Sequence, residues 1–460
     1  MQLRPYQSSL IEELRGGFRA GVRRQLLVSP TGSGKTVLFA FIVKGAVAKT
    51  LRVMVLAHRA EILDQISRTL TAVGVQHGLI QAGEDMSATA QVQVASVQTL
   101  VRRFDKVPSP DIVIVDEAHH STAGQWAKVF AQYPNAMFLG VTATPERLDG
   151  SGLGEFYQRL VRGPEVQWLI DNGFLSQPVY FAPKQAIDLS AIRKMAGEFS
   201  KEDAAALLDK PSITGDAVAH YLKYASRRKA VAFCVNLKHA EHVAEQFRAS
   251  GIPAGTIDGT LTREDRKQRV ADLASGKISV LTSCEIVSEG FDLPAVDAAI
   301  LLRPTASLAL HLQQVGRCLR VAPGKSESII LDHVGNCLRH GLAEEPRDWS
   351  LEGSSSKKRK KDDILDTRQC EKCYAVFSGP VCPQCGAAKV SKARELEQRE
   401  GELEALNAEK VAASRMRLRE EGRAQTLDDL LKLAAARGYK RGWAIHRFQA
   451  RQNRMQPSLP

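Results

Sequence analysis

The 460-residue chain has no long hydrophobic run. Its longest, "VLFAFIV" at 37–43, is far shorter than the roughly 18 residues that a membrane-spanning helix needs. The first residues, "MQLRPYQ", also lack an apolar leader. We therefore expect no membrane partner and a cytoplasmic protein. Hydrophobic residues make up 44% of the chain and charged residues 25%, which is typical of a globular protein with a buried core.

The chain also lacks the secretory leader that accompanies disulfide-rich domains, so we do not expect its eight cysteines to form disulfides. Four of them are scattered, and we expect these to be buried as small hydrophobic side chains: Cys234, Cys284, Cys318 and Cys337. The other four form a tight cluster between residues 370 and 385. In a chain of this kind, such a cluster favours a metal site.

Acidic residues are too few to balance the basic ones, since 63 Lys and Arg against 51 Asp and Glu give a net charge of +12. Residues 346–460 hold 24 Lys and Arg against 16 Asp and Glu, so +8 of this charge lies in the last quarter of the chain. This part of the chain can attract a polyanion such as nucleic acid, although the same charge would also serve solubility alone.

Up to about residue 345, short apolar runs alternate with helical patterns. The runs are continuous rather than alternating, as in parallel strands covered on both faces. They form two series, which predicts an α/β fold with two tandem doubly wound parallel-sheet domains. The first series is 25–30, 52–58, 92–97, 111–117 and 137–144, and the second is 230–235, 254–259, 279–284, 298–303 and 328–334.

The composition predicts six segments along the chain. The two α/β domains occupy residues 1–182 and 213–345, and a polar, helix-leaning segment at 183–212 connects them. After them we expect a basic linker at 346–367, the cysteine cluster at 368–388 and a helical, basic tail at 389–460.

The segment "SPTGSGKT" at 29–36 ends like a P-loop, G-x-x-x-x-G-K-[ST], but it lacks the first glycine, because Ser29 stands there. In a P-loop, glycines let backbone N–H groups turn towards the phosphates, the lysine neutralises phosphate oxygens and the hydroxyl reaches Mg²⁺. Gly32, Gly34, Lys35 and Thr36 supply all of these groups directly after an apolar strand. We predict that the loop binds ATP, because a small residue still fits at its entrance.

The segment "IVIVDEAHH" at 112–120 brings two carboxylates to the end of a hydrophobic strand. Asp116 can hold Mg²⁺ through its hydration shell, and Glu117 can orient and deprotonate an attacking water. Two acidic residues after a strand could simply cap the next helix, but the P-loop upstream favours the catalytic interpretation.

These motifs and several others occur in the order found in superfamily 2 helicases of the DEAH-box type, which the chain resembles over residues 3–320. "SPTGSGKT" resembles motif I, "DEAH" at 116–119 motif II and "TATP" at 142–145 motif III. The resemblance implies two RecA-like domains, ATP and Mg²⁺ as cofactors, and nucleic acid as the partner. It also implies a set of nucleotide contacts in motif I: Thr31, Gly32, Ser33, Gly34, Lys35 and Thr36.

Further motifs of the first domain follow from the same resemblance. "LRPYQ" at 3–7 resembles the adenine-reading element, in which Gln7 would bond the base and Arg4 would lie nearby. "LAHRAEILDQ" at 56–65 and "ASVQTL" at 95–100 resemble motifs that contact the nucleic-acid backbone. The candidate backbone contacts are His58, Arg59 and Thr99, and the candidates for coupling ATP to the strand are His119, Thr142 and Thr144.

In the second domain, "VLTSCEIVSEGFDLP" at 280–294 resembles motif V, so Thr282 would face the strand while Gly290 and Asp292 approach the nucleotide. "QQVGRCLR" at 313–320 resembles motif VI, which begins with Gln313 and would supply the arginine fingers Arg317 and Arg320. A finger can be worth a factor of about 10³–10⁵ in rate, so hydrolysis would require the two domains to close on ATP. Opening and closing would then move two strand-gripping surfaces, as in a motor.

Two segments give a narrower resemblance. "TPERLDGSGLGEFYQRLVRGP" at 144–164 and "IDNGFLSQPVYFAP" at 170–183 resemble the RadD-like DNA helicases and their phage relatives. A four-cysteine cluster after the second motor domain is similar to that group too. The resemblance implies DNA rather than RNA as the partner.

The cysteine cluster has the spacing C-x₂-C-x₈-C-x₂-C. Two thiolates two residues apart can bind one ion, and four arranged tetrahedrally suit a closed, structural Zn²⁺ site. The ligands would be Cys370, Cys373, Cys382 and Cys385. An iron–sulfur cluster and a redox-active dithiol pair are the alternatives.

The end of the chain carries two helical patterns. Residues 391–421 have leucines at near-heptad spacing, which predicts an exposed helix or a weak coiled coil, although such a leucine stripe more often packs on a neighbouring domain. "TLDD" at 426–429 has the form of a capping box, and the helix that it starts should stop at Gly438. The segment 439–451 mixes aromatic and basic residues, which favours contact with DNA, docking of a protein partner or plain packing.

The sequence favours an ATP-dependent DNA helicase or translocase that acts in repair, recombination or replication. Three alternatives remain at this point. The chain could be an RNA helicase, because motor motifs contact chiefly the backbone. It could be the motor component of a nuclease or restriction assembly, or an ATP-dependent remodelling protein that never separates strands.

Overall fold

The computed structural model describes two parts of the chain. The first is residues 1–353 without 85, 88, 121–122, 148–149, 184–188, 190–191, 196–197, 210 and 285–295. The second is residues 367–369, 376–378, 403–405, 424, 426–439, 441–445 and 448. No helix among these residues is both long enough and apolar enough to cross a bilayer.

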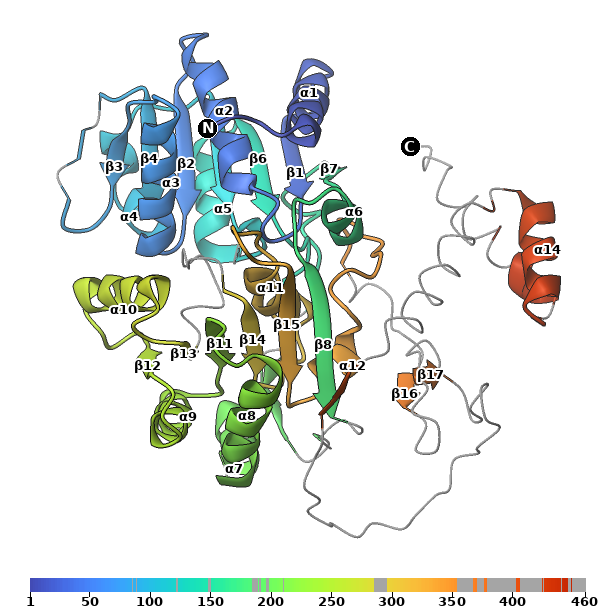
Figure 1. Cartoon of the computed structure of the whole chain (residues 1–460). Coiled ribbons are helices and arrows are strands. Elements are labelled where there is room, and N and C mark those ends of the chain that lie inside the picture. Colours follow the sequence, from blue (N-terminus) through green and yellow to red (C-terminus); the bar gives the residue numbers. More distant parts are fainter. Residues whose placement is uncertain are drawn as a thin grey trace.

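The first domain is built on a parallel sheet in the order β3-β4-β2-β5-β6-β1-β7 (Figure 1). The first series of predicted strands is confirmed, and each strand of that series is almost wholly buried because helices cover both faces of the sheet. The strands are β1 (Arg24–Val28), β2 (Val53–Ala57), β3 (Gly78–Ile80), β4 (Val92–Ser96), β5 (Ile112–Asp116), β6 (Met137–Thr142) and β7 (Arg159–Arg162).

Alternate strand residues point to opposite faces of this sheet. On one face, Leu27 packs in a cluster with the apolar sides of α1 (Pro5–Arg19), α2 (Lys35–Val47) and α3 (Ala60–Ala72). On the other face, Leu26 packs with α4 (Val97–Leu100), α5 (Ala123–Gln132) and the segment 153–157. Two 3₁₀ turns, η1 (Phe104–Lys106) and η2 (Ala118–His120), complete the first domain.

The second domain has a sheet in the order β12-β13-β11-β14-β15-β8-β18, in which all pairs are parallel except β8 and β18. The second series of predicted strands is confirmed. The strands are β8 (Gln177–Pro183), β11 (Ala230–Phe233), β12 (Ala254–Ile257), β13 (Val280–Ser283), β14 (Ala298–Leu301), β15 (Glu327–Asp332) and β18 (Leu403–Ala405).

Helices cover both faces of this sheet as well. One face packs against α6 (Val166–Asp171), α7 (Lys201–Leu208), α10 (Arg263–Ser275) and α11 (Leu308–Cys318). The other face packs against α8 (Pro211–Tyr224) and α9 (Leu237–Ala249). A short helix, α12 (Asn336–His340), follows β15. The architecture is therefore that of two parallel-sheet α/β domains, as the alternating pattern predicts.

The structure differs from the predicted boundary between the domains. The sequence pattern assigns residues up to 182 to the first domain, but β8 pairs with β15 in the second sheet. The connection at 183–212 forms a small hairpin of β9 (Lys194–Met195) and β10 (Glu198–Phe199) followed by α7. Its apolar residue Phe199 belongs to the second core. The polar composition of this segment hid the few apolar positions that attach it there.

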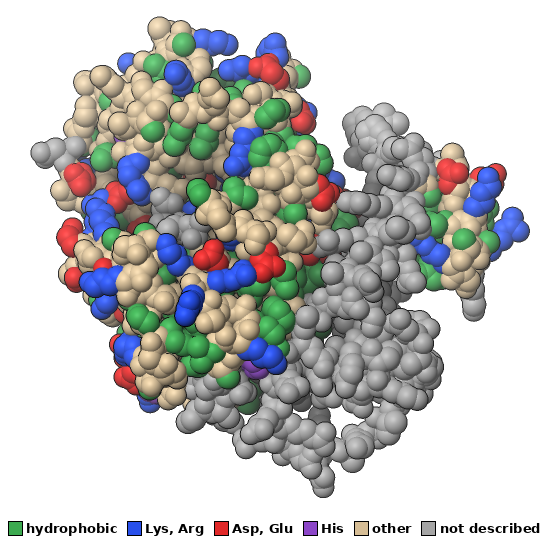
Figure 2. Space-filling view, viewed as in Figure 1, with side chains coloured by type: hydrophobic (Ala, Val, Ile, Leu, Met, Phe, Trp, Pro, Cys, Tyr) green, Lys and Arg blue, Asp and Glu red, His purple; other side chains and the backbone are tan. Residues whose placement is uncertain are grey.

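The two domains touch through charged side chains on one side. Arg263, at the start of α10, donates to both carboxylate oxygens of Asp64 on α3, with an Nε–Oδ2 distance of 3.1 Å. Arg266 forms a second ion pair with Glu61 at 3.1 Å. Figure 2 shows basic and acidic side chains side by side over α10 and the adjoining edge of the first domain.

The segment after the second domain returns to the first one. Trp349 and Leu351 pack against the first-domain cluster around α5, and Gly353 pairs with Ser151 in an isolated β-bridge. Arg162 of β7 donates to the Asp348 carboxylate at 3.2 Å. We call residues 346–353 the return segment. The first part of the predicted basic linker is therefore packed on the first domain.

The described parts of the tail are short. Strands β16 (Thr367–Gln369) and β17 (Val376–Ser378) pair as an antiparallel hairpin. The predicted helix at 391–421 is wrong at 403–405, because these residues form β18 on the edge of the second sheet. A helix, α14 (Leu427–Ala436), starts with a capping box in which Thr426 and Asp429 bond reciprocally. Gly438, with φ of 68°, lies just beyond its end.

Candidate nucleotide-binding and hydrolysis site

The P-loop joins β1 to α2, and its backbone needs two of its glycines. Gly32 has φ of 87° and Gly34 has φ of 80°, a region that side chains with a Cβ rarely adopt. A Cβ on Gly32 would lie 2.8 Å from Leu175 Cδ2, and one on Gly34 would lie 2.7 Å from Gln7 Nε2. Lys35 and Thr36 then open α2, whose first N–H groups face the end of the loop.

Ser29 occupies the position of the missing glycine without disturbing the loop. Its side chain is buried, and its hydroxyl donates to Ser33 Oγ at 2.8 Å. Gly163 lies against the Ser29 side chain, and a Cβ at Gly163 would lie 2.6 Å from Ser29 Oγ. A small hydroxyl side chain therefore fits here and links the two ends of the loop.

The Lys35 ammonium bonds to the loop itself, donating to the carbonyl oxygens of Ser29 at 3.1 Å and Pro30 at 3.4 Å. Burial lowers the pKa of Lys35, and the carboxylates of Glu117 and Asp116 act in the opposite direction. The lysine and the two carboxylates thus belong to one electrostatic site, as the two motifs predict.

Asp116 is the last residue of β5, and Glu117 follows it with a strained backbone. Glu117 has φ of 49°, and its N–H donates to Asp116 Oδ1 at 3.0 Å. Burial, followed by the charge of Glu117, raises the pKa of Asp116 to about 7. Strained non-glycine residues and shifted carboxylates gather at functional sites. The Thr36 hydroxyl and the Asp116 carboxylate line the same cavity, and this hard oxygen donor set fits Mg²⁺.

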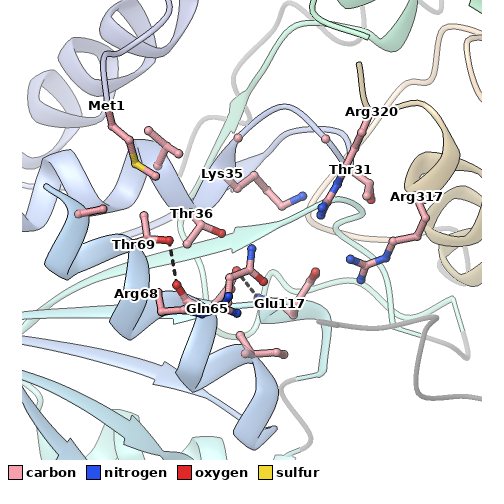
Figure 3. A pocket seen from close by; sticks show the side chains of 16 residues that line it. Met1, Thr31, Lys35, Thr36, Gln65, Arg68, Thr69, Glu117, Arg317 and Arg320 are labelled. Carbon is pink, nitrogen blue, oxygen red and sulfur yellow. Dashed lines mark hydrogen bonds between the residues drawn. The ribbon is translucent and has the colours of Figure 1, made fainter. Parts of the chain in front are cut away.

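The cavity of about 500 Å³ is formed by both domains (Figure 3). Lys35 and Glu117 of the first domain and Arg317 and Arg320 of the second point towards one another in it. The predicted residues that line it are Thr31, Gly32, Gly34, Lys35, Thr36, Asp116, Glu117, Arg317 and Arg320. The structure therefore brings together positions nearly three hundred residues apart in the sequence.

The predicted coupling residues form one hydrogen-bonded chain across the domains. Gln313 Nε2, on α11 of the second domain, lies 3.1 Å from His119 Nε2 of the first. His119 Nδ1 lies 2.9 Å from Thr142 Oγ1, which donates at 2.7 Å to the Thr144 carbonyl. All four residues are buried. Motifs II and III of the first domain are thus connected by hydrogen bonds to α11, the helix that carries Arg317.

The N-terminal residues support the P-loop. Gln7 is buried, its Oε1 accepts from the Arg4 N–H at 2.9 Å, and its Nε2 donates to the carbonyls of Ser33 at 3.1 Å and Gly34 at 3.2 Å. Tyr6 also donates to the Ser33 carbonyl, at 2.5 Å. The Arg4 guanidinium lies 4.8 Å from the centre of the Phe174 ring. Base reading by Gln7 stays a prediction, because its amide here bonds to the loop.

The predicted nucleic-acid contacts differ in their placement. His58 and Arg59 follow β2 and are partly exposed, and Gln98 beside Thr99 on α4 donates to the His58 carbonyl at 3.3 Å. Thr282, in contrast, is fully buried in β13, and its hydroxyl lies 3.0 Å from Thr256 Oγ1. A strand-facing role for Thr282 is therefore corrected, since its side chain points into the sheet packing. The last residues of motif V, Gly290 and Asp292, lie outside the described residues.

The structure also places unpredicted residues at the cavity. Met1 lies on one side of it, and α3 contributes Gln65, Arg68 and Thr69, which Figure 3 shows beside Thr36. Gln65 ends the motif at 56–65 that was assigned to nucleic acid, and Arg68 and Thr69 follow it, so their sequence position drew attention away from the nucleotide. Their spacing on one helix face was the available signal. The four cluster cysteines lie outside the described residues.

The scattered cysteines behave largely as predicted. Cys234, Cys318 and Cys337 are buried and Cys284 is partly exposed, and none of these four forms a disulfide with another described residue. Burial raises the pKa of the Cys318 thiol to about 11. Burial also raises the pKa of Cys234 and Cys337, so these three buried thiols are packing groups rather than nucleophiles.

Comparison with known proteins gives two family matches. The family described as "Type III restriction enzyme, res subunit" matches residues 1–147, and the one described as "Helicase conserved C-terminal domain" matches residues 214–322. The "51.5 kDa protein" of a Lactococcus phage (isolate 7-9) is 33% identical over 439 residues, covering 94% of this chain and 90% of that protein. The "Putative ATP-dependent helicase IRC3" of Saccharomyces cerevisiae is 28% identical over 347 residues, covering 70% of this chain and 50% of that protein.

Solved structures share the fold. A fragment of a putative HsdR subunit of a type I restriction enzyme from Vibrio vulnificus YJ016 has a TM-score of 0.59 at 21% identity, covering 74% of this chain and 67% of that chain. The ATP-dependent Type ISP restriction-modification enzyme LlaBIII, solved bound to DNA, has a TM-score of 0.53 at 18% identity, covering 72% of this chain and 28% of that chain. At these identities the likeness concerns the architecture alone.

Proposed function

This chain belongs to the superfamily 2 helicases and is an ATP-hydrolysing nucleic-acid motor; from this premise we propose that it is a DNA translocase or helicase of the RadD-like group. The observation that carries the proposal is the shared cavity, in which Lys35 and Glu117 of one domain face Arg317 and Arg320 of the other. Such a site links hydrolysis to the relative position of the domains.

Hydrolysis divides between the two domains in this proposal. Thr36 and Asp116 would hold Mg²⁺, which neutralises charge on the phosphates when bound. Lys35 leaves the carbonyls of its own loop to bind the phosphate oxygens, and Glu117 orients and deprotonates the attacking water. Arg317 and Arg320 stabilise the charge that develops as the bond to the γ-phosphate breaks.

In this proposal the second domain moves relative to the first because the arginines belong to α11 and the residues that follow it. Gln313 lies one turn before Arg317 on α11, and it contacts His119, which lies two residues after Glu117. When hydrolysis removes the γ-phosphate, the arginines lose their partner and the contact between the domains weakens. The first-domain surface at His58, Arg59 and Thr99 then shifts relative to the second domain, which moves the bound strand.

DNA is the partner that we propose, in repair, recombination or replication. Support comes from the resemblance of residues 144–164 and 170–183 to RadD-like DNA helicases. The basic end of the chain supplies further charge for a polyanion. The test is the ATPase rate with single-stranded DNA, forked duplex, blunt duplex and RNA. We expect stimulation by DNA, and stimulation by RNA alone would contradict the proposal.

We also propose that Cys370, Cys373, Cys382 and Cys385 hold one structural Zn²⁺. The hairpin of β16 and β17 supports it, because the ladder ends at Gln369 and Val376. The first two cysteines thus fall between paired strands, where two thiolates can converge on one ion. This module and the tail after it would contact DNA or a protein partner.

A second candidate is the motor subunit of a restriction-type assembly. It is favoured by the match of residues 1–147 to the family of type III restriction res subunits. A partner chain would then supply cleavage, because the tail shows no convincing nuclease motif. A nicking assay on the purified chain tests the absence of cleavage that both proposals share: cleavage without a partner contradicts both.

A further inference from the structure

A lysine holds the end of the helix that carries the proposed arginine fingers. Helix α11 ends at Cys318, and Arg320 follows two residues later. The Lys325 ammonium donates to the carbonyl oxygen of Cys318 and, at 2.9 Å, to that of Arg320. It also donates at 2.6 Å to the carbonyl oxygen of Val296. One ammonium group therefore binds three backbone carbonyls.

A tight turn brings Lys325 to this position. The Lys325 N–H donates to the Ala322 carbonyl at 3.1 Å, which closes a four-residue β-turn. Pro323 is the second residue of the turn, and Gly324, with φ of 78°, is the third. This is the arrangement of a type II turn, which needs glycine there. The chain reverses between Arg320 and β15, so the lysine side chain points back at the helix end.

The surroundings of the Lys325 ammonium show that it is held in one position by the protein rather than extended into solvent. Its partners among the described residues are carbonyl oxygens, and the side chain is only partly exposed. A cation that binds the last carbonyls of a helix satisfies acceptors that the helix cannot, and it also interacts favourably with the helix dipole. Surface lysines have no need of such contacts.

The three carbonyls belong to different parts of the site. Val296 directly follows residues 285–295, where the sequence predicts the nucleotide contacts Gly290 and Asp292. Cys318 and Arg320 belong to the motif VI segment, and Arg320 lines the nucleotide cavity. Lys325 thus links the residue after the motif V segment, Val296, to the motif VI segment that contains Cys318 and Arg320.

A second contact restrains Arg320 from the other side. Its backbone forms an antiparallel β-bridge with Leu175, and the Ser176 N–H donates to the Leu319 carbonyl at 2.9 Å. Leu175 in turn lies against Gly32 of the P-loop. The backbone of Arg320 is therefore fixed between Lys325 and the segment that contacts the P-loop, while its guanidinium group stays in the cavity.

We propose that Lys325 is a positioning residue for ATP hydrolysis, which holds the carbonyls of Val296, Cys318 and Arg320 together and so keeps Arg320 directed at the γ-phosphate. The inference rests on the arginine-finger role proposed above. Lys325 itself is not among the residues that line the cavity. Its loss acts on the orientation of Arg320 rather than on the P-loop.

The test is steady-state ATP hydrolysis without nucleic acid by Lys325→Met, which keeps the length of the side chain and removes the charge. We expect kcat to fall about tenfold or more, while KM for ATP changes less than about twofold because the P-loop is unaltered. Lys325→Gln, whose amide can still donate two hydrogen bonds, should give an intermediate kcat. Lys277→Met is the matched control, since Lys277 is exposed on the same domain.

A double variant shows whether the lysine acts through the arginine. In single-turnover hydrolysis, Lys325→Met should lower the rate in the wild-type background but change it less than about twofold in an Arg320→Ala background. An equal loss in both backgrounds overturns the inference, as does a normal kcat for Arg320→Ala or a lower Tm for Lys325→Met with normal kcat. Because the assay contains no DNA, its result can be interpreted even if the proposal of a DNA motor is wrong.

Discussion

His119 Nε2 and Gln313 Nε2 lie 3.1 Å apart, and this contact joins the two domains at the nucleotide site. The amide nitrogen of Gln313 can only donate, so His119 accepts at Nε2 and carries its proton on Nδ1. That proton is donated to Thr142, whose own hydroxyl proton goes to the Thr144 carbonyl. The side-chain protons of Gln313, His119 and Thr142 are therefore donated in sequence from the second domain to motif III, and the Thr144 N–H donates back to Thr142 Oγ1 at 3.2 Å.

Replacing Gln313 with alanine should weaken the coupling. The variant removes the hydrogen bond that Gln313 donates to the buried His119 Nε2, which costs about 1–3 kcal/mol in the closed arrangement. We expect the maximal ATPase rate to fall between about 5-fold and 160-fold, with little change in ATP binding to the P-loop. Gln246→Ala, an exposed position on α9, is the control. A Gln313→Ala enzyme with wild-type rates would contradict the coupling role.

Docking of the return segment should depend on Gly152. A Cβ at this position would lie 2.1 Å from the Leu351 carbonyl oxygen and 2.4 Å from the Gly353 nitrogen. Gly152→Ala should therefore displace residues 346–353 and lower the free energy of unfolding by about 1–3 kcal/mol, as measured by urea denaturation. Gly124→Ala on α5, where a Cβ meets nothing within 4 Å, should leave stability unchanged or raise it. Equal effects of both substitutions would rule out a docking role for Gly152.

The second domain should lose stability in mild acid. Burial lowers the pKa of His239 to about 4, of His333 to about 3 and of His340 to about 4, from 6.5 in the unfolded chain. Because the unfolded chain binds these protons first, stability is complete above pH 6.5 and falls as the pH drops towards 4. The expected slope is about 1.4 kcal/mol per pH unit for each histidine.

His340→Gln tests this slope with urea denaturation between pH 8 and pH 4.5. Glutamine can still donate to the Thr305 carbonyl that His340 Nε2 contacts at 2.9 Å, but it does not titrate. The slope below pH 6.5 should decrease by the contribution of one histidine, with no pH dependence from this position at pH 7–8. An unchanged slope would show that His340 does not titrate on unfolding.

Metal removal should affect only the end of the chain. We expect one Zn²⁺ per chain by metal analysis, released by a chelator from the native protein and reduced in Cys373→Ser. Proteolysis within 368–388 should become faster after its release, while basal ATP hydrolysis stays the same, because the cavity residues come from the two α/β domains. A purified chain without zinc or iron would refute the metal site.

The sequence predicted the parts of this molecule that depend on local patterns. Apolar runs such as 111–117 identified the strands, because a parallel sheet buries both of its faces. The phosphate loop was predictable from Gly32 to Thr36. Only the structure explains why serine fits at position 29: Gly163, which is distant in the sequence, leaves room for the Ser29 side chain because it has no Cβ. Parts that depend on distant contacts were missed: β8 has an ordinary strand pattern, and nothing in it reveals which of two sheets it joins.

Two errors have the same physical origin. Thr282 was expected at the surface because of the motif around it, but its position in β13 directs its hydroxyl to Thr256. Leucines at near-heptad spacing indicated a helix at 403–405, whereas the free edge of β8 accepts these residues as a strand. In both cases a tertiary contact, rather than the local sequence pattern, determines where the residues lie.

The sequence also carries no sign of the role proposed for Lys325, because a lysine in a Pro-Gly turn resembles an ordinary surface residue.

The central claim is that closing the two domains on ATP moves the chain along DNA. The most direct measurement is the displacement of streptavidin from biotinylated single-stranded DNA, together with displacement of a third strand from a triplex. We expect ATP-dependent displacement by the wild-type chain and none by Lys35→Ala, which should still bind DNA because Lys35 lies in the nucleotide cavity. ATP hydrolysis that DNA stimulates, with no displacement on either substrate, would contradict the account.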